Sequence, residues 1–206
     1  MTMQTIKGPA VFLAQFAANE APYNSLPSLA AWAQEKGFKG VQIPTWDTRL
    51  VDMKQAAESE TYVDEIKGLL DDHGLTLTEF ASHITGQLVA VHPAHDQIMD
   101  SFAPEQVRGN PSARRAWAEE QLRFAVRASK RLGITTHTTF SGSLLWPYLY
   151  PYPQWPEGLI EEGFTELAAR WKPILDDFDA YGIDACFEIH PCEDLHDGHS
   201  WEYFLE

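Results

Sequence analysis

Short apolar runs alternate with longer amphipathic segments along the whole chain. The apolar runs have the length of β-strands, and we expect strands at residues 9–16, 40–44, 75–83, 134–142 and 183–191. Between them, apolar residues recur at helical spacing, which predicts helices at residues 25–37, 61–74, 113–133 and 158–182. Ser200 is the expected N-cap of one further helix. The pattern therefore predicts strands and helices in strict alternation, interrupted by a long connection and an aromatic, proline-rich loop.

The loops of this pattern are of two kinds. Long polar and aromatic loops follow the strands, whereas short turns with a glycine follow the helices. Strands that alternate with helices favour a parallel sheet. The asymmetry of the loops is typical of an α/β fold of the (β/α)8 TIM-barrel type, whose active-site face is built from the loops at the carboxyl ends of the strands. A doubly wound sheet would show the same asymmetry and stays open as an alternative.

Length and composition indicate one soluble domain. The 206 residues are enough for a single core, and we expect one partial barrel domain over residues 1–206. The chain lacks an apolar run long enough to cross a membrane and a start typical of a secretory signal. Its two cysteines, Cys186 and Cys192, fit no disulfide framework. We therefore expect a cytoplasmic protein that does not bind membranes.

The charge of the chain argues against nucleic-acid partners. Fifteen Lys and Arg residues stand against thirty Asp and Glu residues, which gives a formal net charge of −15. A phosphate backbone is repelled by such a field unless a basic patch overcomes it. The one basic cluster lies in residues 113–133, where glutamates and apolar residues separate the arginines. We interpret this cluster as the solvated face of a helix.

The candidate chemistry is concentrated in the last expected strand. Because side chains alternate along a strand, Cys186, Glu188 and His190 share one face, and Phe187 and Ile189 share the other. The apolar pair should face the covering helices, which places Glu188 and His190 in the interior at the carboxyl end of the strand. A carboxylate in that position needs a charged partner, hydrogen bonds or a bound cation. A purely structural role for either residue stays open.

Two further histidines fall on expected strands. His83 ends the third strand, so it should lie at the same end of the sheet as Glu188. His137 lies in the middle of the fourth strand, with Thr139 on the same face, and fits a buried structural role equally well. Trp46 follows the second strand and lies at the corresponding mouth.

Three short motifs on this pattern resemble one family. They are "GVQIP" at residues 40–44, "ASH" at 81–83 and "FEIHP" at 187–191. With the β/α alternation, they make the chain similar to the xylose isomerase-like TIM-barrel family of sugar and sugar phosphate isomerases and epimerases. The resemblance implies a divalent metal, Mn, Mg, Co or Zn, whose first carboxylate ligand matches Glu188. It also implies a sugar-binding carboxylate just beyond that residue, for which Asp194 is the counterpart.

The chain departs from the family pattern after the fifth strand. Only about five of the eight β/α units have positions in this sequence, and the family's ligands on later strands have none. An arc of five strands cannot close, and its last strand presents an unpaired edge. Either the 206 residues are part of a longer chain or something else completes the sheet, and we expect a truncated product.

The resemblance leads to a functional hypothesis with two alternatives. We expect a divalent-metal-dependent isomerase or epimerase of a sugar, active in carbohydrate metabolism. In this hypothesis Glu188 and His190 are catalytic and Glu188 binds the metal, while the small-molecule sugar contacts His83, Trp46, Asp194 and His137. One alternative is an inactive barrel fragment that binds a ligand or forms a homo-oligomer through its open sheet edge. The other is a metal-dependent phosphodiesterase or endonuclease, which the net charge disfavours.

Overall fold

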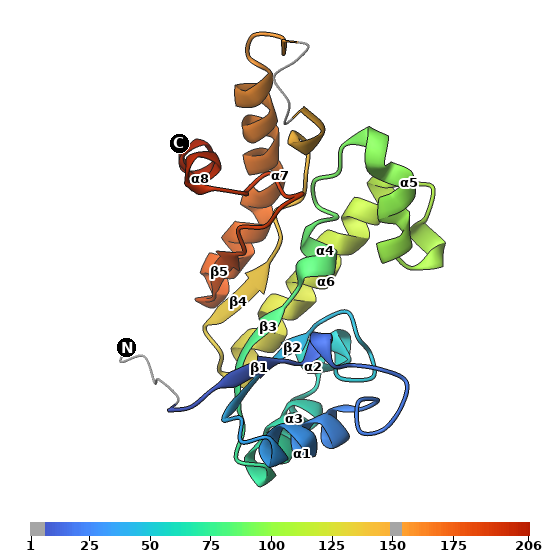
Figure 1. The fold of residues 1–206 in the computed structure, drawn as a ribbon, viewed down its shortest axis with the longest axis vertical. Coiled ribbons are helices and arrows are strands. Elements are labelled where there is room, and N and C mark those ends of the chain that lie inside the picture. Colours follow the sequence, from blue (N-terminus) through green and yellow to red (C-terminus); the bar gives the residue numbers. More distant parts are fainter. Residues whose placement is uncertain (1–6, 149–153) are drawn as a thin grey trace. The chain divides into compact units, whose positions relative to one another are not determined.

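A five-stranded parallel sheet is the centre of the architecture. The computed structural model describes residues 7–148 and 154–206, and its strands follow one another in the sheet in sequence order (Figure 1). The strands are β1 (Ala10–Phe12), β2 (Gly40–Pro44), β3 (Thr76–Ala81), β4 (Thr136–Thr139) and β5 (Asp184–Phe187). This confirms the predicted α/β fold, with neighbouring strands joined by helical crossovers as in β/α barrels.

The helices fall where the apolar spacing places them, with additions. They are α1 (Leu26–Glu35), α2 (Met53–Glu58), α3 (Glu60–Asp72), α4 (His83–Gly86), α5 (Asp96–Met99), α6 (Pro111–Leu132), α7 (Leu159–Tyr181) and α8 (Gly198–Leu205). The four long helices α1, α3, α6 and α7 confirm the prediction to within a few residues. The sequence pattern missed α2, α4 and α5, because helices of four to six residues are too short to show a repeating apolar stripe.

Side-chain caps begin several of these helices. The Ser25 hydroxyl accepts a hydrogen bond from the backbone N–H of Ser28 at 3.4 Å and begins α1. At α8 the expected cap was wrong. Asp197 is the N-cap, and its carboxylate accepts from the N–H of Ser200 at 2.8 Å, while the Ser200 hydroxyl accepts from the N–H of Asp197 at 3.0 Å. This reciprocal capping box moves the start of the helix three residues upstream.

Four strands, β1, β3, β4 and β5, end earlier than predicted, and two of these ends change the candidate site. β3 ends at Ala81, and His83 begins α4 instead of ending the strand. β5 ends at Phe187, so Glu188 and His190 lie in the segment that follows it. The N–H of Glu188 still donates to the carbonyl of Thr139 at 3.0 Å. The predicted interior position of Glu188 was wrong, since its side chain is 51% exposed, because the alternation of faces stops where the strand stops.

The chain forms two compact units. The first unit comprises residues 1–81, 124–137 and 181–184, and the second comprises residues 82–123, 138–180 and 185–206. The expectation of a single domain over residues 1–206 stays a prediction. In the part of the chain that the structure describes, no helix is long and apolar enough to cross a membrane.

The first unit has a continuous apolar core. β1, β2 and β3 pair in parallel, with Val41 of β2 opposite Val11 on one side and Leu77 on the other. Val41 and Ile43 are fully buried, and they belong to one apolar cluster with residues of α1, α2, α3 and α6. At about 25 cal/mol per Å² of apolar surface buried, such a cluster is the main stabilising contribution to this unit.

The second unit is organised around α7. Trp171 of α7 is fully buried and donates its indole N–H to the carbonyl of Ser141 at 2.7 Å. Its ring meets Phe187 edge to face with 4.7 Å between centroids, which confirms that Phe187 faces a covering helix. Ile189 was expected on the same face, but it is 50% exposed, because it lies beyond the end of β5. Within this unit α8 lies beside the amino-terminal part of α7 (Figure 1).

Candidate functional site

A histidine and a glutamate meet just beyond the carboxyl ends of β3 and β5. His83, the first residue of α4, places Nε2 3.0 Å from Oε2 of Glu188. The two side chains differ in exposure, with His83 at 7% and Glu188 at 51%. The pair therefore has one buried member that holds its position and one carboxylate that solvent and a ligand can reach.

Burial sets the protonation state of the pair. Removal from water lowers the pKa of His83, while the charge and the hydrogen bond of Glu188 oppose that shift and His190 adds to it. The imidazole is thus neutral at pH 7. Its Nε2 is the ring atom nearest the Glu188 carboxylate, so the buried ring limits where that carboxylate can lie.

An aromatic ring connects this pair to His190. The ring of Phe140 lies 4.4 Å from the ring of His83 and 4.7 Å from that of His190, measured between centroids. Phe140 follows β4, so three successive strands contribute to this cluster. The structure thus brings together three of the predicted site residues, His83, Glu188 and His190. We call these three residues and Phe140 the His83–Glu188 site.

The fourth predicted residue of this unit, Asp194, has a buried carboxylate that accepts only backbone N–H groups in the described contacts. It is 1% exposed, and it accepts hydrogen bonds from Leu144 at 2.6 Å, Leu145 at 2.8 Å and Trp146 at 3.1 Å. These three bonds fix the loop that follows β4. Burial raises the pKa of Asp194, and the three N–H groups oppose that shift.

The neighbouring carboxylate, Glu193, holds an earlier part of the same loop. It accepts the N–H of Gly142 at 2.5 Å and lies 3.4 Å from the hydroxyl of Ser141. Burial raises the pKa of Glu193 to about 7, and the charge of Asp194 adds to this shift. Cys192, in the turn just before it, has a φ of 74°, a region that non-glycine residues rarely adopt. Two buried acids therefore connect the segment after β5 to the loop after β4.

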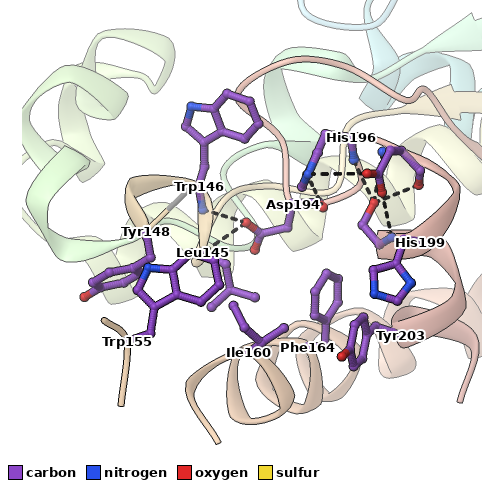
Figure 2. Close-up of a pocket in the computed structure, with 12 residues that line it drawn as sticks. Leu145, Trp146, Tyr148, Trp155, Ile160, Phe164, Asp194, His196, His199 and Tyr203 are labelled. Carbon is purple, nitrogen blue, oxygen red and sulfur yellow. Dashed lines mark hydrogen bonds and ion pairs between the residues drawn. The ribbon is translucent and has the colours of Figure 1, made fainter. Parts of the chain in front are cut away.

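An aromatic pocket of about 250 Å³ lies beside this loop. Figure 2 shows Tyr148 and Trp155 on one side of it and Phe164 and Tyr203 on the other. Phe164 and Tyr203 stack with 5.3 Å between ring centroids and an angle of 12° between planes. The other lining residues are Leu145, Trp146, Ile160, Asp194, His196, Asp197, His199 and Ser200. We call this cavity the aromatic pocket.

The two remaining predicted site residues belong to the first unit. His137 is fully buried in β4, and its Nδ1 lies 3.5 Å from the hydroxyl of Ser129. Trp46 follows β2, and its ring meets Phe12 edge to face at 6.1 Å. Their predicted contacts with a sugar stay predictions.

The described residues do not provide a complete metal centre. A divalent cation in a protein is usually held by three or more side-chain donors. Across residues 7–148 and 154–206, no group of three or more His, Cys, Asp or Glu side chains could hold a metal ion. Glu188 and His83 supply one carboxylate and one imidazole, which is fewer than such a centre needs.

Comparison with protein families identifies the fold. The family model described as the xylose isomerase-like TIM barrel matches residues 30–206. The chain belongs to this family. The resemblance predicted from "GVQIP", "ASH" and "FEIHP" is therefore confirmed for this xylose isomerase-like chain. A comparison of its sequence with curated proteins finds no match.

Solved structures with the same fold have low sequence identity to this xylose isomerase-like chain. The probable 3-DHS dehydratase AsbF from Bacillus anthracis has a TM-score of 0.61 at 14% identity over 97% of this chain and 58% of that one. L-ribulose 3-epimerase has a TM-score of 0.57 at 16% identity over 97% and 56%. A xylose isomerase-like TIM barrel protein from Mycobacterium smegmatis, in complex with magnesium, has a TM-score of 0.57 at 13% identity over 96% and 60%. The chain thus spans less than two thirds of these structures, and the likeness shows the fold.

Several residues of these sites were not predicted from the sequence. Phe140 connects His83 and His190, but nothing in "TTFSG" marks it out from other apolar residues. Glu193 lies next to the predicted Asp194, and an adjacent pair of acids after an apolar strand was a usable signal. Tyr203 and Phe164 come from helices whose pairing no local pattern specifies.

Proposed function

We propose that this chain serves in the isomerisation or epimerisation of a sugar, with Glu188 as the group that moves a proton. The observation that carries the proposal is the Glu188 carboxylate, half exposed and held at 3.0 Å by the buried His83, in a member of the xylose isomerase-like family. The names of similar structures, which include sugar epimerases, support the same reaction class. Because the chain spans less than two thirds of these structures, its catalytic activity as a sugar isomerase or epimerase is itself proposed.

The roles follow from the geometry of the pair. By the proton-transfer route, epimerisation or isomerisation of a ketose removes a proton from a carbon next to the carbonyl and returns it to a different face or carbon. A carboxylate that solvent can reach, and that a neighbour orients, is suited to such general acid and base work. His83 is the positioning residue, because its buried imidazole lies 3.0 Å from the carboxylate. His190, across Phe140 from His83, is in reach of a hydroxyl of the same ligand.

A divalent metal would polarise the carbonyl of a bound sugar in such a site. Glu188 is the proposed carboxylate ligand, and the magnesium in the complex of the Mycobacterium smegmatis protein supports metal use in this fold. The described residues supply fewer donors than a complete centre needs. For this reason we assign to residues of this chain the orientation, the proton transfer and one metal ligand, Glu188.

Deuterium exchange tests the proposed proton transfer. D-fructose, D-tagatose and L-ribulose are incubated with the chain in D₂O, and NMR records the appearance of C–D bonds next to the carbonyl. Glu188→Gln should slow the exchange by about 100-fold or more, the usual contribution of a general base. Glu166→Gln is the matched control, because the Glu166 side chain is also 51% exposed and also lies in an ion pair. Equal exchange rates in the two variants would exclude Glu188 as the base.

Thermal unfolding tests the proposed metal ligand. Mn²⁺ is titrated into the wild-type chain and into Glu188→Gln, and the shift in Tm is compared. A ligand that binds only the folded state raises Tm, so we expect a shift that the variant loses. A shift of the same size in Glu188→Gln would remove Glu188 from the set of ligands.

A further inference from the structure

The aromatic pocket is separate from the His83–Glu188 site within the second unit. Neither His83, Glu188 nor His190 lines it. Its walls are rings from the connection between β4 and α7, from α7 and from α8, with Tyr148 and Trp155 facing Phe164 and Tyr203 (Figure 2). The proton transfer proposed above uses none of these residues, so the pocket needs an explanation of its own.

The size of the aromatic pocket suits a ligand of one ring. The cavity measures about 250 Å³, whereas pockets for drug-sized ligands begin at about 300 Å³. Flat ring walls favour a ligand that is itself flat or has a face of C–H groups. A single six-atom ring fits both conditions.

The charges around the aromatic pocket select a neutral ligand. Among the described lining residues there is no lysine or arginine, while Asp194 and Asp197 both contribute. A phosphate or carboxylate on the ligand would therefore meet like charge without a cationic partner. The acids do not call for a cationic ligand either. Asp194 accepts three backbone N–H groups, and Asp197 caps α8.

The polar groups of the aromatic pocket suit hydroxyl groups. His196, His199 and Tyr203 line it together with Tyr148. Neutral imidazole and phenol groups can each donate and accept a hydrogen bond, and so can every hydroxyl group of a sugar. His196 is held in place by its own Nδ1, which lies 2.9 Å from the carbonyl of Asp194, and by a ring contact with Trp146 at 5.2 Å.

We propose that the aromatic pocket binds one neutral, unphosphorylated monosaccharide, as a second sugar subsite distinct from the His83–Glu188 site. The choice of a sugar among neutral ring compounds rests on the proposed function. Asp194 contributes as a positioning residue, because its three hydrogen bonds fix residues 144–146 and thereby place the wall that ends in Tyr148.

NMR titration of the 206-residue chain with three probes tests the proposal. D-fructose should shift the side-chain signals of His196, His199 and Trp155. D-fructose 6-phosphate should bind at least about fivefold more weakly, because its charge is not matched in the aromatic pocket. Tetramethylammonium, a compact cation, should also bind more weakly than D-fructose. Tighter binding of either charged probe, or shifts by D-fructose that leave these three residues unaffected, would overturn the proposal.

A matched pair of tyrosine variants makes the assignment specific. Tyr148 and Tyr181 are each 36% exposed, but only Tyr148 lines the aromatic pocket. Tyr148→Ala should weaken D-fructose binding about tenfold, as expected when one stacking wall is lost, and Tyr181→Ala should leave it unchanged. An equal effect of the two variants would exclude the aromatic pocket as the binding site.

The two proposals fail in different ways. Glu188→Gln should slow deuterium exchange by about 100-fold or more and keep the shifts of His196 and His199 by D-fructose. Exchange that depends on Glu188 without these shifts would overturn the subsite alone. Shifts without exchange would overturn the proposed function alone and would leave the aromatic pocket as a sugar-binding site.

Discussion

The interior of the first unit and the interior of the second unit are stabilised by different kinds of contact. In the first unit, one apolar cluster joins strands and helices, and Ser129 and His137 are its only buried polar residues among those described. In the second unit, Arg114, Glu193 and Asp194 are buried together with several hydroxyl groups. Arg114 donates to Asp100 at 2.6 Å and to the carbonyl of Asp96 at 2.9 Å.

This difference explains why the candidate sites lie in the second unit. An apolar cluster stabilises a fold without regard to the direction of each contact. Buried carboxylates that bind backbone N–H groups fix particular loops in particular positions, because hydrogen bonds are directional and costly to leave unmade. Loops that carry His83, Phe140 and the aromatic pocket need that second kind of contact.

Among the changes that test this difference between the units, removal of the Asp194 carboxylate should lower the free energy of unfolding most. Asp194→Ala leaves three backbone N–H groups without their acceptor. We expect the free energy of unfolding to fall by about 3 to 5 kcal/mol, since each unsatisfied buried group costs about 1 to 3 kcal/mol. Urea unfolding measures the loss, and hydrogen exchange should show deprotection at residues 144–146. Asp194→Asn keeps one acceptor oxygen and should lose less. Unchanged protection of these amides would mean that apolar packing holds this loop as well.

Titration of Glu193 should have an intermediate effect. Burial holds its pKa at about 7 instead of 4.5, so between these pH values the folded chain keeps a proton that the unfolded chain releases. The free energy of unfolding should therefore fall as pH rises from 4.5 to 7, by roughly 1 to 3 kcal/mol, and this contribution should level off above pH 7. Glu193→Gln retains an acceptor for Gly142, and its stability should lack this dependence. Parallel pH profiles of the wild type and the variant would show that Glu193 titrates normally.

Removal of helix caps should have the smallest effect and should be equal in the two units. Asp52 caps α2 in the first unit through the N–H of Gln55 at 2.9 Å, and Asp197 caps α8 in the second through that of Ser200 at 2.8 Å. Asp52→Ala and Asp197→Ala should each cost about 1 kcal/mol in thermal or urea unfolding. A much larger cost for Asp197 would indicate that α8 depends on this cap for its place beside the aromatic pocket.

Prediction from the sequence succeeded where the signal is repeated along an element. The bounds of β2, "GVQIP", agree with the structure, because β-branched residues between a glycine and a proline define a short strand. The long helices were predicted because their apolar residues recur at helical spacing over several turns. The carboxyl ends of β1, β3, β4 and β5 were not predicted, since each run of residues typical of a strand continues past the point where the strand ends. His83 and Glu188 lie in two of these continuations.

The sequence by itself determined the order of strands and helices, the parallel sheet and the family, because hydrophobic periodicity and short motifs are local properties of the chain. Tertiary structure alone decided that His83 lies 3.0 Å from Glu188 across 105 residues of sequence, and that Asp194 accepts hydrogen bonds from the loop 48 to 50 residues before it. It also decided that Tyr148 and Tyr203 line one pocket. The physical reason is that a side chain's partner and its desolvation depend on which distant segments pack against it, and no local pattern contains that information.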